Sequence, residues 1–450
     1  MDASVGFIAD YTHALRFEDL PADVVRLAKR SVIDTFGLAI GAFNAEPSRI
    51  ARAMAERASV RDGARVIGTA HRTLPELAAF ANGVMGRYLD GNDCFLGAGH
   101  PSDAIAAVLA VADTRHADGR SIITAIAAAY EVHYNLCKAV SVLAKGVDST
   151  FYIVVAGAVG AAKILGLDRA RIVETLALAV APNIPLDTTR YGQLSMWKGC
   201  AAGAAVRNSV FAALLAQAGM TGPEKPIEGN HGIQNFVGKF ELKPFGGNGR
   251  PYGIHEVTLK RFCTVAHSLS PITVALELSR LVAVEDIEKV TVYTYRFAWE
   301  INGREPEKWR PTTREAADHS LPYIVAAVLI DRGFDDEIFS DERLRDPRIR
   351  ALIDKIECKE DPEITRRYPQ QMPCRIEITT KSGERKIAQI DYPRGHDKNP
   401  MSDEEVSEKF RGFVQRALRS ARVDQALQAL WQLESASDLD EIFEALKIKA

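Results

Sequence analysis

Polar and ionisable side chains gather in one glycine-rich segment directly before an apolar helix. The segment YLDGNDCFLGAGHPSD contains Asp90 and His100, and Pro101 and Ser102 mark the start of the next helix. A histidine titrates near neutral pH, and an aspartate can orient it or exchange a proton itself. The free N–H groups of a helix start also attract anions. We therefore predict that Asp90 and His100 act on an anionic substrate, while Ser102 and Asp103 cap the helix.

Three further segments carry residues suited to binding an acid. TTRYGQLSMWKGC contains Arg190 and Lys198, and Lys198 opens an Ala-rich helix. A cation in such surroundings needs an anion, although a lysine at a helix start can instead extend to solvent. TTREAADHSLPY contributes His319 and Tyr323, for which helix capping and core packing are the alternatives. KRFCTVAH adds His267 at the transition from a loop to a helix.

Composition excludes several classes of protein. The chain has 450 residues, 47% hydrophobic and 26% charged, with a net charge of -3, which predicts about two domains and no nucleic-acid partner. No CxxC, HExxH, P-loop or GxSxG motif occurs, so we expect no metal and no cofactor. Neither a basic leader nor an apolar stretch of membrane-spanning length is evident, so we expect a cytoplasmic protein without a membrane partner.

The periodicity of apolar residues changes once along the chain. Residues 1–268 repeat them at helical spacing and are rich in Ala and Gly, which predicts an all-helical domain. In 269–399, EKVTVYTYRF alternates like a strand, RIEITTKSGERKIAQIDY predicts a hairpin, and RIRALIDKIECK predicts a helix. A capping box at Ser402 and Glu405 opens helices in 400–450 that we expect to fold back onto the first domain. The predicted fold is mainly α, with a smaller α+β domain built on an antiparallel sheet.

Taken in order, these segments resemble the MmgE/PrpD family, whose members include 2-methylcitrate dehydratases, cis-aconitate decarboxylases and iminodisuccinate epimerases. The resemblance covers essentially the whole chain and rests on YLDGND…GHPSD, KILGLD, YGQLSMWKGCAAGAAVRNSVFAALLAQAGMTGP, IEGNHG, ADHSLPYIVAAVLID and RGHDKNPMSDEEVSEKF. It implies a helical domain, an α+β lid domain, a catalytic cleft between them and a homodimer.

The resemblance also implies roles for particular residues. The family's active-site acid, histidine, lysine and lid-domain tyrosine fall on Asp90, His100, Lys198 and Tyr323. Three departures from the family pattern are Cys94 in place of a common Thr, Gly91-Asn92 in place of an aromatic and acidic pair, and Asp148 in place of a histidine found in many members. The last departure favours the dehydratase-like members over the decarboxylases.

We therefore expect a metal-independent hydro-lyase that acts on a 2-methylcitrate-like di- or tricarboxylate by abstracting the proton next to a carboxylate. Asp90 and His100 form the proton-transfer pair, with the choice of base open, and Tyr323 donates a proton or hydrogen bond. Lys198 and His267 bind carboxylates. The remaining substrate-binding candidates are Cys94, Arg190 and His319. The alternatives are an epimerase, a decarboxylase, or an inactive relative that only binds.

Overall fold

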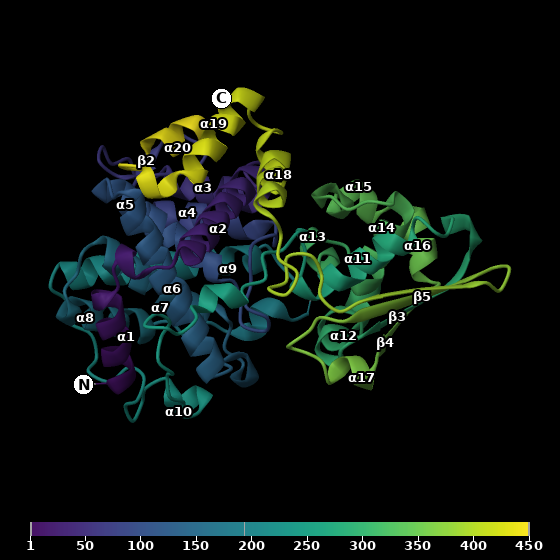
Figure 1. Ribbon diagram of the computed structural model, residues 1–450, viewed down its shortest axis with the longest axis horizontal. Helices are drawn as coiled ribbons and strands as arrows, with labels where there is room; N and C mark the ends of the chain where they lie inside the picture. Colours follow the sequence, from purple (N-terminus) through teal and green to yellow (C-terminus); the bar gives the residue numbers. More distant parts are fainter. Residues whose placement is uncertain (1, 193, 449–450) are drawn as a thin grey trace. The chain divides into compact units, whose positions relative to one another are not determined.

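The computed structural model describes residues 2–192 and 194–448 (Figure 1). The chain divides into two compact units. The first unit comprises Met1–Arg190, Trp197–Val257 and Ser402–Ala450, and the second comprises Tyr191–Met196 and Thr258–Met401. The fold is mainly α with small sheets, as the periodicity predicts.

The first unit is helical apart from a short two-stranded ribbon. Its helices are α1 (Ala3–Ala14), α2 (Ala22–Gly41), α3 (Glu46–Ala55), α4 (Pro75–Tyr88), α5 (Ile105–Arg115), α6 (Gly119–Ala139), α7 (Thr150–Ile164), α8 (Arg169–Val180), α9 (Trp197–Gln217), α10 (Gln234–Val237), α18 (Asp403–Val414), α19 (Ser420–Trp431) and α20 (Asp440–Leu446), and its strands are β1 (Ala64–Arg65) and β2 (Arg72–Thr73). Helix α9 packs against α4, α7 and α8.

Glycines allow α4 and α9 to pack closely. A Cβ atom on Gly203 would lie 2.8 Å from the carbonyl oxygen of Phe80, and one on Gly199 would lie 3.3 Å from the Cα atom of Tyr88. The first distance is too short for a side chain without movement of the backbone, and the second is tighter than most side-chain contacts. The close approach brings the first turn of α9, which carries Lys198, against the C-terminal end of α4.

Helix α9 is long and apolar enough to cross a membrane by length and composition. Within its most apolar window, however, 61% of the helix is buried inside the protein. This is the placement of a core helix, and its many Ala and Gly residues serve helix packing.

The C-terminal helices, yellow in Figure 1, return to the N-terminal helix α2. Helix α18 begins with the expected capping box, in which Ser402 accepts a hydrogen bond from the amide of Glu405 and the Glu405 carboxylate accepts one from the amide of Ser402. Lys409 of α18 pairs with buried Asp34 at 2.7 Å and donates to the carbonyl of Gly91, also at 2.7 Å. The end of the chain therefore supports the loop that carries the candidate site.

The second unit is a mixed sheet with short helices. Its elements are α11 (Leu269–Leu278), β3 (Ile287–Thr294), α12 (Arg296–Asn302), α13 (Arg314–Ala317), α14 (Leu321–Asp331), α15 (Asp341–Leu344), α16 (Pro347–Ile353), β4 (Ile356–Glu360), α17 (Pro362–Thr365), β5 (Cys374–Thr380) and β6 (Arg385–Ile390). The strand order is β4-β3-β5-β6, and α11 and α14 pack against the sheet.

The strand patterns predict most of this sheet. β5 and β6 form the expected antiparallel hairpin, with Gly383 in the left-handed conformation at its turn. One detail differs, because RIRALIDKIECK forms both a helix and a strand. Helix α16 ends at Ile353 and β4 pairs parallel to β3, with Val292 opposite Cys358, so the sheet is not wholly antiparallel. A parallel partner is set by a crossover connection, which local periodicity does not encode.

Candidate functional site

Asp90 lies at the C-terminal end of α4, one turn after Arg87. It adopts a left-handed backbone conformation with φ of 53°, which Asp tolerates better than most residues because of its short polar side chain. Its side chain is buried, and one carboxylate oxygen, Oδ1, accepts a hydrogen bond from Nη1 of Arg87 at 2.8 Å. The left-handed residue ends the helix and turns the carboxylate back toward the arginine of the preceding turn.

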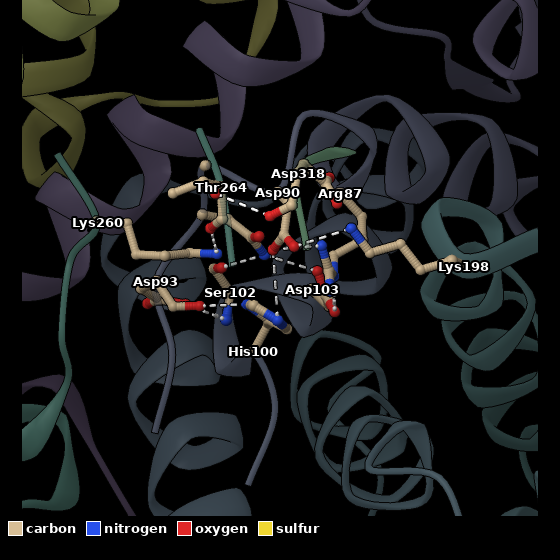
Figure 2. Close-up of polar contacts among 12 residues, drawn as sticks. Arg87, Asp90, Asp93, His100, Ser102, Asp103, Lys198, Lys260, Thr264 and Asp318 are labelled. Atoms are coloured by element: carbon tan, nitrogen blue, oxygen red, sulfur yellow. Dashed lines mark hydrogen bonds and ion pairs between the residues drawn. The ribbon is translucent and has the colours of Figure 1, made fainter. Parts of the chain in front are cut away.

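Lys198 supplies the second cation to the same carboxylate. Its Nζ donates to Oδ2 of Asp90 at 3.0 Å, and both side chains are 2% exposed (Figure 2). A lysine in the first turn of a helix opposes the helix dipole, and a buried ammonium needs a counterion. Asp90 is that counterion, so the alternative in which Lys198 extends to solvent is wrong.

His100 lies beside this ion pair. Its Nδ1 is 2.7 Å from the carbonyl oxygen of Asp93. A carbonyl only accepts, so Nδ1 carries the proton, and in the neutral ring Nε2 holds a lone pair. Nε2 lies 3.8 Å from Oδ1 of Asp90, and the side chain is 15% exposed. In this tautomer Nε2 can accept a proton, and the Asp90 carboxylate lies where it would stabilise the resulting imidazolium.

Asp93 organises the loop beneath His100. Its carboxylate accepts hydrogen bonds from the hydroxyl of Tyr130 at 2.6 Å and from the amide of Ser102 at 3.0 Å. Burial raises the pKa of Asp93, and the hydrogen bonds from Ser102 and Tyr130 oppose this rise. The free N–H at the start of the 3-10 turn Pro101–Ala104 is therefore satisfied by Asp93, not by a side chain within the turn.

The predicted capping roles of Ser102 and Asp103 are wrong for this reason. The Ser102 hydroxyl accepts a hydrogen bond from the side-chain amide of Asn92. The same Nδ2 atom of Asn92 donates to the carboxylate of Asp103 at 2.8 Å. Asp103 also lies 3.7 Å from Nε of Arg87. Burial raises the pKa of Asp103 to about 7, although the positive charge of Arg87 opposes this. Asp103 is a buried partner of Arg87 and not a surface cap.

Arg190 contacts the backbone of Lys198. Its Nη1 donates to the carbonyl oxygen of Lys198 at 2.9 Å, and its Nε pairs with Asp148 at 2.7 Å. Burial tends to raise the pKa of Asp148, but the Arg190 guanidinium outweighs it and holds that pKa below its usual value. Asp148, which stands where many family members have a histidine, thus forms an ion pair with Arg190. Arg190 in turn positions the first turn of α9.

Three of the predicted residues, His267, His319 and Tyr323, lie in the second unit. His267 is buried, and its Nδ1 lies 2.6 Å from the hydroxyl of Tyr295. His319 hydrogen-bonds with its neighbour Asp318 through Nδ1. Ser320, not His319, caps α14.

Tyr323 lies in the hydrophobic core of the second unit. Its hydroxyl donates to the carbonyl oxygen of Ile338 at 2.7 Å, and burial raises its pKa well above the usual value. A phenol that donates to a backbone carbonyl in the core holds structure together. This placement argues against the proton-donor role expected for Tyr323.

Two residues of the first unit support the site but were not predicted from the sequence. Arg87 lies three residues before Asp90, close enough along the chain for the two side chains to pair at the end of α4, and this spacing could have identified it. His133 of α6 is fully buried, and its Nε2 lies 2.8 Å from the carbonyl of Ala98, so it holds the loop between Asp90 and His100. Only the tertiary structure brings His133 to this loop. Cys94 is buried in the same loop.

The buried His133 predicts a pH dependence of stability. Burial lowers its pKa from 6.5 to about 4, so the folded protein keeps the neutral ring. The unfolded chain takes up a proton below pH 6.5, and the stability contributed by the neutral ring is lost as the pH falls from 6.5 toward 4. We expect a loss of roughly 2 kcal/mol between pH 7 and pH 5 from this residue.

His133→Gln keeps a donor toward Ala98 and removes the titration. Urea unfolding of both proteins at pH 7 and pH 5 measures the difference. Equal pH dependence in the two proteins would contradict this account of His133.

Comparison with known proteins identifies the family of the chain. The profile of the MmgE/PrpD N-terminal domain matches residues 7–243, and that of the MmgE/PrpD C-terminal domain matches residues 262–433. The chain therefore belongs to the MmgE/PrpD family, as the sequence motifs predict. Its fold is mainly helical with a second, sheet-containing unit, and a buried Asp–Lys–Arg cluster lies beside a histidine.

Several relatives are similar over most of their length. A 2-methylcitrate dehydratase-like protein of Aspergillus oryzae is 29% identical, covering 98% of this chain and 95% of its own. The 2-methylcitrate dehydratase of Cupriavidus necator is 28% identical over 93% of both chains. The 2-methylcitrate dehydratase of Escherichia coli strain K12 is 31% identical over 75% of this chain and 74% of its own.

Proposed function

We propose that the protein is a hydro-lyase that dehydrates a 2-methylcitrate-like tricarboxylate. The observation that carries this proposal is the buried Asp90 carboxylate between Arg87 and Lys198, with Nε2 of His100 beside it. Asp103 is the second acid of this cluster, and burial raises its pKa to about 7, so the cluster carries a positive charge when Asp103 is protonated and can then attract a substrate carboxylate. The names of the relatives support dehydration as the reaction.

His100 is the base in this proposal, because both oxygens of Asp90 already accept hydrogen bonds from Arg87 and Lys198, whereas Nε2 of His100 can accept a proton. Nε2 of His100 takes the proton from the carbon next to a substrate carboxylate, and Lys198 and Arg87 stabilise the negative charge that develops. The electron pair left by the broken C–H bond forms a C=C double bond to the neighbouring carbon, whose C–O bond breaks with its electron pair leaving on the oxygen. The imidazolium returns its proton to this oxygen, so water departs and neutral His100 is restored.

A substrate panel tests the reaction. Purified protein is incubated with 2-methylcitrate, citrate, cis-aconitate and related diacids, and the products are followed by NMR in D2O. Dehydration of 2-methylcitrate, unchanged by EDTA, is the expected result. Deuterium exchange with inversion would indicate an epimerase, and release of CO2 a decarboxylase. Saturable binding without turnover of any acid would identify an inactive relative and contradict the proposal.

We also propose that the chain forms a homodimer through the first unit. Large apolar side chains are exposed on this unit, including Leu186 at 66% and Phe211 at 51%. A two-fold interface uses the same surface on both copies, so an exposed side chain such as Phe211 would be buried twice in it. Sedimentation velocity at micromolar concentration should give the mass of two chains, and Phe211→Glu should give a monomer. A wild-type protein that sediments as a monomer would count against the dimer.

A further inference from the structure

The second unit contains a pocket that the proposed reaction does not use. The pocket has a volume of about 450 Å³ and lies between the C-terminal end of α14, helix α16 and the start of β4. Three basic side chains line it, Arg332, Arg348 and Lys355, together with the single acid Glu285. Ile330 and Leu352 form an apolar wall that is continuous with the core of this unit. The pocket thus combines excess positive charge with an apolar surface.

The three cations differ in how far they are neutralised. Arg348 pairs with Asp346 through Nη2 at 2.7 Å, and Lys355 donates to the carbonyl oxygen of Ile287 at 2.5 Å. The guanidinium of Arg332 has neither an ion pair nor a side-chain hydrogen bond with any residue that the structure describes. An anion in the pocket would meet its strongest unsatisfied donor at Arg332.

The backbone of Arg332 provides a second observation. The residue caps the C-terminal end of α14 with φ of 52° and ψ of 26°, a left-handed conformation in which glycine is strongly preferred. Glycine occupies the next position, Gly333, although at 332 it would relieve the strain. The same left-handed cap occurs at His116 of α5, so the conformation alone does not mark a function. At Arg332 it holds an exposed guanidinium in the lining of this pocket.

We propose that this pocket binds a small organic polyanion. Its charged end, a phosphate or a pair of carboxylates, lies against Arg332, Arg348 and Lys355, and its apolar body lies on Ile330 and Leu352. Phosphate esters and polycarboxylates share this chemistry, since both present a fork of oxygens to a guanidinium.

Arg332→Gly offers a test that does not depend on damage to the fold. Glycine suits the left-handed conformation, so the variant should unfold at the same temperature as wild type or higher, with unchanged turnover. His116→Gly is the matched control, because His116 is an exposed residue of the first unit that caps α5 with φ of 46°. It should also unfold at the same temperature or higher and should bind the anion like wild type.

Calorimetric titration of the full-length chain in 150 mM KCl measures binding of phenyl phosphate and of citrate. We expect saturable binding of phenyl phosphate that Arg332→Gly weakens at least tenfold. Citrate can also bind at the site around Lys198. Only the component of citrate binding that Arg332→Gly removes therefore reports on the pocket. If that component is present only for citrate, the pocket prefers carboxylates over phosphate. The proposal is overturned if neither anion shows a component that Arg332→Gly removes, or if His116→Gly weakens binding equally.

Discussion

Replacing His100 by Asn is expected to lower kcat by roughly a hundredfold to ten-thousandfold while changing KM little, because a general acid–base group acts in the transition state. Asn is chosen because its side-chain amide can still donate to the carbonyl oxygen of Asp93, as Nδ1 does at 2.7 Å. The variant therefore keeps the loop geometry and lacks only the atom that would take the proton, Nε2.

Steady-state kinetics on the acid that the panel identifies measures this effect. His13→Gln is the matched control, because His13 is exposed on α1 and has no place in the site. Its kcat should equal that of the wild type. Wild-type turnover in His100→Asn would exclude His100 as the base and return that role to Asp90.

The second large effect is expected at Asp90. Asp90→Asn leaves Lys198 and Arg87 buried beside a neutral amide, and removal of one partner from a buried ion pair typically costs about 3–5 kcal/mol. The free energy of unfolding in urea should fall by an amount of this order, and turnover should fall with it because the imidazolium of His100 loses its carboxylate.

A double variant separates stability from chemistry. In Asp90→Asn combined with Lys198→Met, the unpaired ammonium is gone, and Arg87 can still interact with Asp103 at 3.7 Å. Part of the lost stability should return, while turnover should stay low because a cation for the substrate carboxylate is missing. A double variant whose stability loss equals the sum of the two single losses would show that the two side chains are not coupled.

Sequence reasoning identified the segments of the site better than the interactions inside them. Asp90, His100 and Lys198 were singled out by their polar company, and the structure brings these three together within the first unit. The role of Ser102 was misassigned, because the residue that caps its turn, Asp93, lies nine positions earlier in a loop whose path no periodicity predicts. The family resemblance predicts Tyr323 as a site residue, and only packing shows that its hydroxyl faces the carbonyl of Ile338.

Local patterns alone determined the mainly helical fold, the β5–β6 hairpin and the capping box at Ser402, since each depends on contacts between residues a few positions apart. Tertiary structure decided which charges meet. Lys198 and Asp90 are 108 positions apart, and they pair because glycines let α9 approach the end of α4. A buried ammonium can be neutralised by any carboxylate that the fold brings within about 3 Å, and the sequence offers 59 acidic residues without saying which. That choice is made by the packing of helices, which spacing along the chain does not record.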